Sequence, residues 1–420
     1  MFEFVEKVGF NGYYVPECIE NIIATKLAKE FGVCTLQKFN PDVYARENKD
    51  KIACSLKSMF NGNTVDYSNL ELIYSLYYLP QNMFKIWTPL VDLFYRQNLM
   101  RNQISILDIG CGPGTSTLGL LEFYKQLALE NKGSQYDITI DVIEKQDGFL
   151  KIFEELIEEY IVHLPQNLSV NLRNIYHKEI TNNFDFLAEQ EYDLIYASNL
   201  FNLNEVNGNR YFAECCKNLT SKLKPSSSMI FIEPGQESIS NQFKEVRNYV
   251  EKCGIISIYS PCCSLHENQH NRCVKFCIAK VKNAHSRLLL FLSKISQELN
   301  INEHSFDYAV FRNDGIKKYN VTRKKRVKLC DIDWNNLGQK VNITAIIMLS
   351  NSTRDGGLGL IICDGTTSEK VWLNISKKQV DFNHLHLDLL RGEMIDVKNA
   401  IVSGRNRLQL SVDSEFEVMY

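Results

Sequence analysis

The chain has 420 residues, 45% of them hydrophobic and 23% charged. This composition excludes a chain that is disordered or fibrous as a whole, and the length indicates two or three domains because single cores rarely grow beyond ~250 residues. The formal net charge of -3 excludes a protein that is basic throughout. No run reaches the ~18 apolar residues of a membrane span, and the start lacks a secretory or transit signal, so we expect a soluble, cytoplasmic chain with no membrane partner.

The first hundred residues are predicted to be helical. Apolar residues recur there at helical spacing, for example at Leu70, Ile73 and Leu76, and no strand-like alternation is present. From Ile104 onwards the pattern changes to short apolar runs separated by helical stretches, at 104–109, 137–144, 192–198 and 228–234. Strands that alternate with helices in this way predict a parallel sheet covered on both faces.

A glycine-rich turn follows the first of these strands. In the run ILDIGCGPGT, the residues Asp108, Gly110, Gly112 and Gly114 lie between an apolar strand and an amphipathic helix. Glycines let a chain turn tightly and bring peptide N–H groups and a helix N-terminus against a ligand. The spacing D-x-G-x-G-x-G differs from the dinucleotide motif G-x-G-x-x-G, and no Lys-Ser/Thr follows as in a Walker loop. It resembles the first motif of class I S-adenosylmethionine-dependent methyltransferases.

That resemblance implies an acidic residue at the end of the second strand, where it accepts hydrogen bonds from both ribose hydroxyls, and Glu144 stands there. Asn199 and Glu233 follow the fourth and fifth strands, where the topology of such a sheet places substrate contacts. They are the candidates for catalysis. Asn199 has no prolines beside it, however, so the Asn/Asp-Pro-Pro-aromatic motif of amino-methylating enzymes is missing.

A cysteine-rich segment lies between residues 253 and 277. Thirteen cysteines in a reducing compartment are free thiols or metal ligands rather than disulfides. Four of them fall within sixteen residues and are interleaved with His266 and His270: Cys262, Cys263, Cys273 and Cys277. The spacing differs from the paired C-x2-C knuckles of zinc ribbons, so an iron–sulfur cluster and zinc both remain open, as do unliganded thiols. Because Pro261 precedes it, Cys262 is also a candidate nucleophile of the cytosine-methylating type.

The last part of the chain is predicted to bind nucleic acid. The stretch 317–328 carries seven Lys or Arg in twelve residues, which suits a solvated linker or an RNA contact. Beyond it, five short strands between residues 341 and 412, with a helical insertion before the fourth, resemble an OB-fold. Such barrels stack bases on exposed aromatic side chains. The candidates are Trp372, for which core packing is the alternative, and the loop arginines Arg354, Arg405 and Arg407.

Several motifs together resemble one family, the methyltransferase-like proteins of the mitochondrial small ribosomal subunit and their prokaryotic relatives. They run from SLYYLPQNMFKIWTPLVDL through LDIGCGPGT, VIEKQ, YDLIYASNLFNLNE and FIEPGQES to SPC, RC, FC and KLCDI. The resemblance covers residues 65–335 and implies a [4Fe–4S] cluster held by Cys262, Cys273, Cys277 and Cys330. Cys263 and Ser264 stand where the family has Pro-His, so Cys263 is an alternative ligand, and zinc is the alternative metal.

The sequence therefore predicts four parts. They are a helical N-terminal domain (1–100), a Rossmann-like class I methyltransferase core (101–252), a cysteine-rich metal-binding segment with a basic connector (253–335) and an OB-fold-like β-barrel (336–420). The family implies an S-adenosylmethionine-dependent RNA methyltransferase that acts on small-subunit ribosomal RNA or the assembling small ribosomal subunit. The alternative is a catalytically inactive iron–sulfur assembly or translation factor that uses the methyltransferase fold to bind RNA. A small-molecule methyltransferase is a third, more remote reading.

Overall fold

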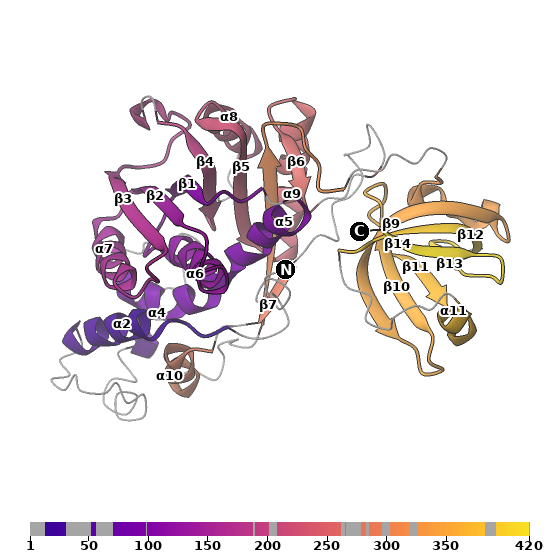
Figure 1. Ribbon diagram of the computed structural model, residues 1–420, viewed down its shortest axis with the longest axis horizontal. Coiled ribbons are helices and arrows are strands. Elements are labelled where there is room, and N and C mark those ends of the chain that lie inside the picture. Colours follow the sequence, from indigo (N-terminus) through magenta and orange to yellow (C-terminus); the bar gives the residue numbers. More distant parts are fainter. Residues whose placement is uncertain are drawn as a thin grey trace. The chain divides into compact units, whose positions relative to one another are not determined.

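The computed structural model of the chain consists of two compact units (Figure 1). The first contains residues 1–240 and 278–314, and the second contains residues 241–277 and 315–420. The structure describes residues 13–30, 52–55, 70–97, 99–187, 190–200, 208–261, 265, 279–282, 285–295, 303–319, 326–382 and 392–419. Among the helices in these ranges, none has the length and apolar character needed to cross a bilayer.

A largely parallel sheet forms the centre of the first unit. Its parallel strands are β1 (Gln103–Ile109), β2 (Tyr136–Glu144), β3 (Leu168–His177), β4 (Tyr192–Ser198) and β5 (Leu223–Pro234). The antiparallel strand β8 (Glu303–Arg312) pairs with β5, and the short β7 (Ala279–Lys282) pairs with β8. The strands follow the order β3-β2-β1-β4-β5-β8. The predicted parallel sheet is therefore confirmed, with the antiparallel strand β8 next to β5.

The order of the strands reverses between β1 and β4. Because parallel crossovers are right-handed, helices on the two sides of this reversal cover opposite faces of the sheet. On one side are α6 (Thr115–Glu130) and α7 (Asp147–Ile161), and on the other is α8 (Gly208–Thr220). The helix α9 (Glu237–Lys252) begins in the first unit and ends in the second. In open α/β sheets, ligands bind at the carboxyl ends of the strands beside such a reversal.

Helices before the sheet pack on the α6 and α7 side. They are α2 (Glu17–Glu30), α4 (Glu71–Asn82), the 3-10 helix η1 (Met83–Ile86) and α5 (Trp87–Gln97), and α10 (Arg287–Ile295) joins them from later in the chain. The apolar spacing in 70–79 predicted α4, which buries Ile73 and Leu76. At Gly119 of α6, a β-carbon would lie 1.9 Å from the Met83 carbonyl oxygen, so only glycine permits η1 to pack this closely.

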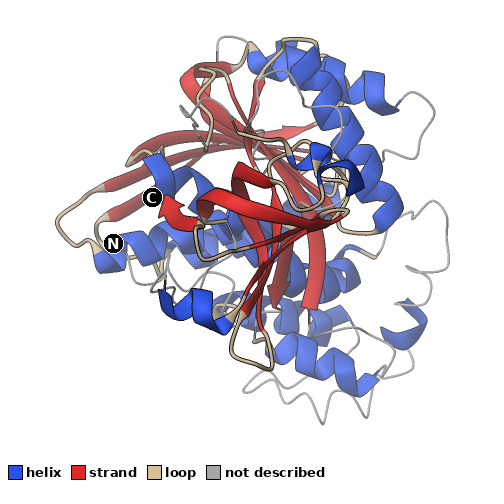
Figure 2. Ribbon diagram, turned by 90° about the vertical axis from the view of Figure 1, so that its right-hand side faces the viewer, coloured by secondary structure: helices blue, strands red, loops and turns tan. Residues whose placement is uncertain are grey.

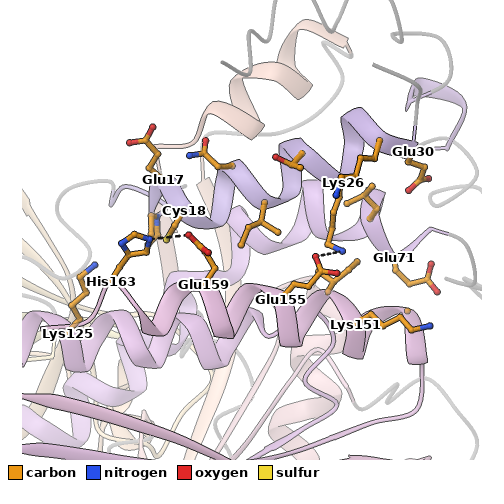
Figure 3. Close-up of a pocket in the computed structure, with 18 residues that line it drawn as sticks. Glu17, Cys18, Lys26, Glu30, Glu71, Lys125, Lys151, Glu155, Glu159 and His163 are labelled. Atoms are coloured by element: carbon orange, nitrogen blue, oxygen red, sulfur yellow. Dashed lines mark hydrogen bonds and ion pairs between the residues drawn. The ribbon is translucent and has the colours of Figure 1, made fainter. Parts of the chain in front are cut away.

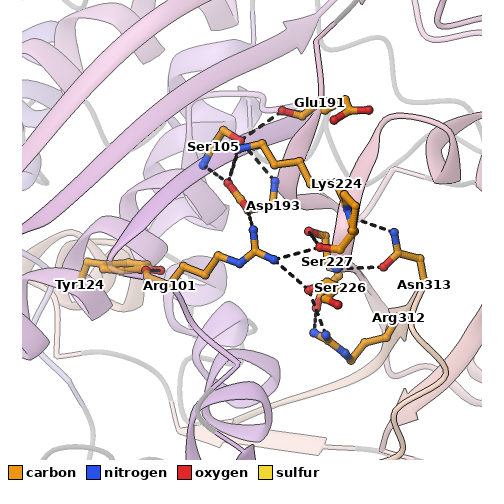
Figure 4. A network of polar contacts seen from close by, with 12 residues as sticks. Arg101, Ser105, Tyr124, Glu191, Asp193, Lys224, Ser226, Ser227, Arg312 and Asn313 are labelled. Atoms are coloured by element: carbon orange, nitrogen blue, oxygen red, sulfur yellow. Dashed lines mark hydrogen bonds and ion pairs between the residues drawn. The ribbon is translucent and has the colours of Figure 1, made fainter.

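The amino ends of three strands are joined by a polar network around Asp193 (Figure 4). Its carboxylate accepts hydrogen bonds from the Ser105 N–H at 2.8 Å and from the Lys224 ammonium at 2.8 Å, and it forms an ion pair with Arg101. Burial tends to raise the pKa of Asp193, but these contacts hold it below its usual value. The network stabilises β1, β4 and β5 at their amino ends, opposite to the carboxyl ends where ligands bind in such sheets.

The second unit contains a closed β-barrel, whose curved strands are visible in Figure 2. Its strands are β9 (Lys340–Ser352), β10 (Leu358–Cys363), β11 (Val371–Ile375), β12 (Met394–Gly404) and β13 (Arg407–Gln409), with β14 (Glu415–Met419) paired to β12. The ring closes because β13 pairs with both β11 and β12. Alternate side chains, such as Leu358, Leu360 and Ile362, fill the interior. This unit also contains β6 (Ser257–Ser260) and the 3-10 helices η3 (Leu329–Asp331) and η4 (Trp334–Asn336).

Two details of the barrel differ from the expectation. The helix before the fourth barrel strand is α11 (Lys377–Phe382), whereas the run LHLDLL that predicted it lies outside the described residues. The last strand, expected to continue to Val412, ends at Gln409. A turn follows, in which the Ser411 N–H donates to the Ser414 hydroxyl at 2.8 Å, and the chain then pairs again as β14.

Candidate cofactor-binding site

The glycine turn lies at the carboxyl end of β1, in the left-handed backbone region. The φ angles of Gly110, Gly112 and Gly114 are 68°, 53° and 85°. A β-carbon would lie 2.6 Å from the Leu200 side chain at Gly110 and 2.5 Å from Phe153 at Gly114, whereas at Gly112 it would meet no atom within 4 Å. The first and third glycines therefore permit close packing, and the middle one exposes its backbone to open space where a ligand can approach.

Glu144 ends β2 and reaches the same turn. One oxygen of its carboxylate accepts a hydrogen bond from the Gly112 N–H at 3.0 Å, and the other accepts from the N–H groups of Lys145 and Gln146 at 2.8 and 2.9 Å. A carboxylate offers about four lone-pair positions, so Glu144 can accept roughly one further hydrogen bond as it stands. A ribose diol that donates from both hydroxyls would replace the contact to Gly112.

Asp108 supports the turn from within the protein. Its side chain is 1% exposed and accepts a hydrogen bond from the Thr117 hydroxyl at 2.6 Å, and that hydroxyl lies 2.8 Å from the Tyr196 hydroxyl. Burial raises the pKa of Asp108 to about 7, against the lowering effect of the hydrogen bonds from Thr117 and Tyr196. The described contacts of Asp108 thus link β1, α6 and β4, and its direct role in holding a cofactor stays a prediction.

The two candidate catalytic residues differ in exposure. Asn199 is exposed in a left-handed conformation with φ of 52°, and its N–H donates to the Ile232 carbonyl at 2.8 Å. Glu233 is 2% exposed near the end of β5. Both therefore stand at the carboxyl edge of the sheet, as predicted from the strand order, and Asn199 alone of the two offers its side chain to solvent.

A buried lysine that the sequence analysis did not single out lies near this edge. Lys85 of η1 is 5% exposed, and its ammonium lies 5.7 Å from the centre of the Phe306 ring. Burial lowers the pKa of Lys85 to about 8, and the charge of Glu233 opposes this shift. Its position within the apolar run NMFKIW concealed it, because such a pattern predicts a buried helix face. A charged residue inside that run was the available signal.

The predicted metal ligands are described only in part. Cys262, Cys263, Cys273 and Cys277 lie outside the described residues, whereas Cys330 is described and its thiol donates to the Asp331 carboxylate at 3.3 Å. The pKa of this thiol is raised, mainly because the thiol is partly buried. Within the ranges that the structure describes, no group of three or more His, Cys, Asp or Glu side chains could hold a metal ion.

One described residue of the cysteine-rich segment contacts the barrel next to Cys330. The Leu265 N–H donates to the Asp364 carbonyl at 3.1 Å, and the Asp364 carboxylate accepts from the Leu329 N–H at 2.8 Å. Leu265 is two residues beyond Cys263 in sequence, and Cys330 directly follows Leu329. Asp364 therefore connects the two segments that contain predicted ligands.

The barrel places the predicted RNA-contacting residues on its outer face and turns. Trp372 is half-buried and alternates with the core residues Val371 and Leu373, so its side chain points away from the interior. Its neighbour on β13 is Arg407, which is exposed, as are Arg354 and Arg405. The alternative of core packing for Trp372 is excluded by this alternation.

The basic segment 317–328 contains a residue with a structural role. The guanidinium of Arg326 forms two hydrogen bonds of 2.8 Å with the Asp396 carboxylate, which is 2% exposed and also accepts from the Thr344 hydroxyl. Arg326 thus belongs to the barrel wall and is not available to phosphate. Residues 320–325 of the segment lie outside the described residues.

A large cavity lies between α2 and α7 (Figure 3). It has a volume of about 1390 Å³, and its lining includes the ion pair between Lys26 and Glu155, 2.6 Å apart. His163 and Glu159 also face it. No residue of the glycine turn lines this cavity, and its charges of both signs define no single class of ligand.

The strand order, the antiparallel β8 and the glycine turn after β1 together define the Rossmann-like fold of class I methyltransferases. No family model and no curated protein sequence matches the chain.

Among solved structures, the chain is similar to a methyltransferase of Pyrococcus furiosus, with 14% identity over 55% of this chain and 83% of that chain and a TM-score of 0.31. It is also similar to a class I S-adenosylmethionine-dependent methyltransferase of Listeria monocytogenes, with 12% identity over 73% of this chain and 82% of that chain and a TM-score of 0.33. A third similar structure is the N-methyltransferase NodS of Bradyrhizobium japonicum in complex with S-adenosylhomocysteine. The identity is 12% over 62% of this chain and 98% of that chain, and the TM-score is 0.30.

Proposed function

We propose that the first unit binds S-adenosylmethionine and transfers its methyl group. The observation that carries this proposal is the carboxylate of Glu144, 3.0 Å from the Gly112 N–H at the carboxyl ends of β2 and β1. When bound, S-adenosylmethionine supplies a methyl group on a sulfonium that already favours transfer. Glu144 would hold the ribose, the backbone at Gly110, Gly112 and Gly114 would contact the rest of the cofactor, and the site would mainly orient the reactants.

The acceptor in this proposal is RNA of the small ribosomal subunit. Support comes from the barrel, where Trp372 and Arg407 are neighbours on the outer face of β11 and β13, as a stacking side chain and a phosphate contact would be. The family resemblance of residues 65–335 supports the same target. In this proposal Asn199, which is exposed after β4, would contact the acceptor.

Residues 262–330 would hold a [4Fe–4S] cluster in this proposal. The ligands would be Cys262, Cys273, Cys277 and Cys330, with Cys263 as the alternative for one of them and zinc as the alternative metal. The hydrogen bonds that join Leu265 and Leu329 to Asp364 support the approach of the first and last ligands. Anaerobic purification followed by iron and sulfide analysis tests the cluster, and Cys330→Ser should abolish its visible absorption. Stoichiometric zinc without sulfide would show that the bound metal is zinc and not an iron–sulfur cluster.

A second candidate function is a catalytically inactive factor that assists assembly or translation of the small subunit. One observation favours it: Asn199, where a catalytic motif is expected, is exposed and lacks the following prolines. Transfer of label from S-adenosylmethionine to small-subunit RNA separates the two functions. If the RNA is labelled by the wild type and by the surface control Glu154→Ala but not by Glu144→Ala, the protein is an enzyme. Cofactor binding without transfer, together with co-sedimentation with assembling subunits, supports the factor.

A further inference from the structure

The segment before the first barrel strand is held firmly against the barrel. Leu329 and Ile332 belong to the barrel core, the Asn406 N–H donates to the Ile332 carbonyl at 3.1 Å, and η4 begins with a capping box at Asp333. Trp334, the first residue of η4, is nevertheless 65% exposed. An indole kept in water on an ordered segment suits contact with a ligand better than it suits packing.

The ring of Trp334 lies against the end of β12. A β-carbon at Gly404, the last residue of this strand, would be 3.6 Å from two ring atoms of the indole, so the backbone there supports the ring. Since the ring is supported on this side and largely exposed, it offers a flat apolar surface of the kind on which nucleobases stack.

A cavity of about 500 Å³ lies beside the indole. This volume is within the range of small-ligand sites and suits one nucleotide. The lining residues come from the pre-barrel segment, the loop before β11 and the turn after β12, and they include Cys330, Asp333, Trp334, Asn335, Glu369 and Arg405.

The polar residues of the cavity complement a nucleotide. Arg405 is exposed and lines the cavity, so its guanidinium can meet a phosphate. The Asp333 carboxylate already accepts two hydrogen bonds from Asn335. Glu369 lines the same cavity, and a carboxylate there can accept from the N–H groups that every base presents on its pairing edge.

We propose that this cavity binds one unpaired nucleotide of RNA, with its base stacked on Trp334 and its phosphate at Arg405. Arg405 is two residues from Arg407, which is the neighbour of Trp372. A single-stranded RNA bound on the outer face of β11 would therefore continue over the turn to Trp334. This inference rests on the proposed RNA-binding role of the barrel. It adds a site to which residues before the barrel contribute as well as barrel loops.

The test measures the affinity of the full-length chain for a labelled 12-nucleotide single-stranded RNA by fluorescence anisotropy. Trp334→Ala should weaken binding at least about fivefold, the lower end of what one stacked base contributes. The control Leu337→Ala removes another exposed side chain of this segment, 54% exposed and outside the cavity, and should change affinity less than about twofold. Equal affinities of Trp334→Ala and wild type would overturn the proposal.

A second measurement follows the fluorescence of Trp334 itself. In Trp372→Phe the remaining tryptophans are Trp334 and the buried Trp87, so RNA should quench the emission, and it should not do so in the double variant with Trp334→Phe. A mononucleotide serves as the second probe. Quenching by the mononucleotide without any RNA binding would retain the nucleotide site and remove the RNA role of the barrel, whereas no response to either probe would overturn both.

Discussion

The carboxylate of Glu144 accepts a hydrogen bond from the backbone N–H of Gly112 at 3.0 Å. This contact joins the end of the second strand to the middle glycine of the turn after the first strand. The conformation of the turn and the position of the carboxylate therefore depend on each other. Substitution of either residue should alter the site without unfolding the sheet.

Gly112→Ala should abolish or strongly weaken the binding of S-adenosylmethionine with a modest loss of stability. The left-handed backbone costs alanine about 1–2 kcal/mol, and the new methyl group would project into open space where no atom lies within 4 Å. Calorimetric titration and chemical denaturation measure the two effects. Gly133→Ala is the matched control, because its β-carbon meets only Asn131 at 3.9 Å. Full cofactor affinity in Gly112→Ala would contradict the assignment of this turn.

Asp108 should make stability fall as the pH rises from about 4 to about 7. Its pKa is about 7 in the fold, where burial raises it, against an ordinary value of 3.8. Between these values the folded state holds a proton that the unfolded state has released, so the free energy of unfolding decreases with pH in this window. Asp108→Asn removes the titration and should gain up to about 4 kcal/mol relative to wild type between pH 4 and pH 8.

Denaturant unfolding of the two proteins across this range checks the prediction. The difference between the two free energies of unfolding isolates Asp108 from the other titrating groups. A difference that is constant with pH would show that Asp108 is ionised in the fold throughout.

Lys85→Met should stabilise the protein at pH 7. Burial lowers the pKa of Lys85 from 10.5 to about 8, although the charge of Glu233 opposes this shift, so the folded state carries a buried charge at a net cost at neutral pH. Between pH 8 and 10.5 the unfolded state binds a proton that the folded state lacks, so the contribution of Lys85 to stability rises with pH. The advantage of Lys85→Met, up to about 3 kcal/mol, should therefore shrink as the pH approaches 10.

Thermal or denaturant unfolding at pH 7 and pH 9.5 measures this effect, with the exposed Lys132→Met as its control. A variant that is less stable than wild type at both pH values would mean that the ammonium of Lys85 forms contacts that stabilise its charge.

Arg326→Ala should destabilise the barrel by about 3–5 kcal/mol, because it removes two charge-assisted hydrogen bonds from the buried Asp396 carboxylate. Asp396→Asn in the Arg326→Ala background should recover part of the loss, since a neutral amide costs less to bury than a carboxylate. Arg354→Ala, an exposed arginine of the same unit, should change stability by less than about 0.5 kcal/mol. Denaturant unfolding of the four proteins would refute the buried pair if the single variants at 326 and 354 behaved alike.

Local patterns in the sequence predicted the class of fold and the position of the glycine turn. Alternation of apolar strands with helices gave the parallel sheet, and the spacing of Gly110, Gly112 and Gly114 gave the turn whose left-handed conformation only glycine adopts readily. Glu144 followed from its place at the end of the second strand.

Contacts between residues distant in sequence could not be predicted in this way. Arg326 resembled one more charge in a basic run, because its partner Asp396 is 70 residues away. The buried contacts of Asp108 with Thr117 and Tyr196 also depend on the register of the sheet, and its direct role at the cofactor stays a prediction. The exposed ring of Trp334 could not be predicted either, because the residue that supports it, Gly404, is 70 residues away in sequence.

Calorimetric titration of the purified chain with S-adenosylhomocysteine tests the central claim most directly, because it requires no knowledge of the acceptor. We expect saturable binding of one molecule per chain in the wild type and in Glu154→Ala, and a loss of at least about tenfold in affinity in Glu144→Ala, where the ribose loses a charged acceptor. The absence of saturable binding in the wild type, or an affinity unchanged by Glu144→Ala, would contradict the account.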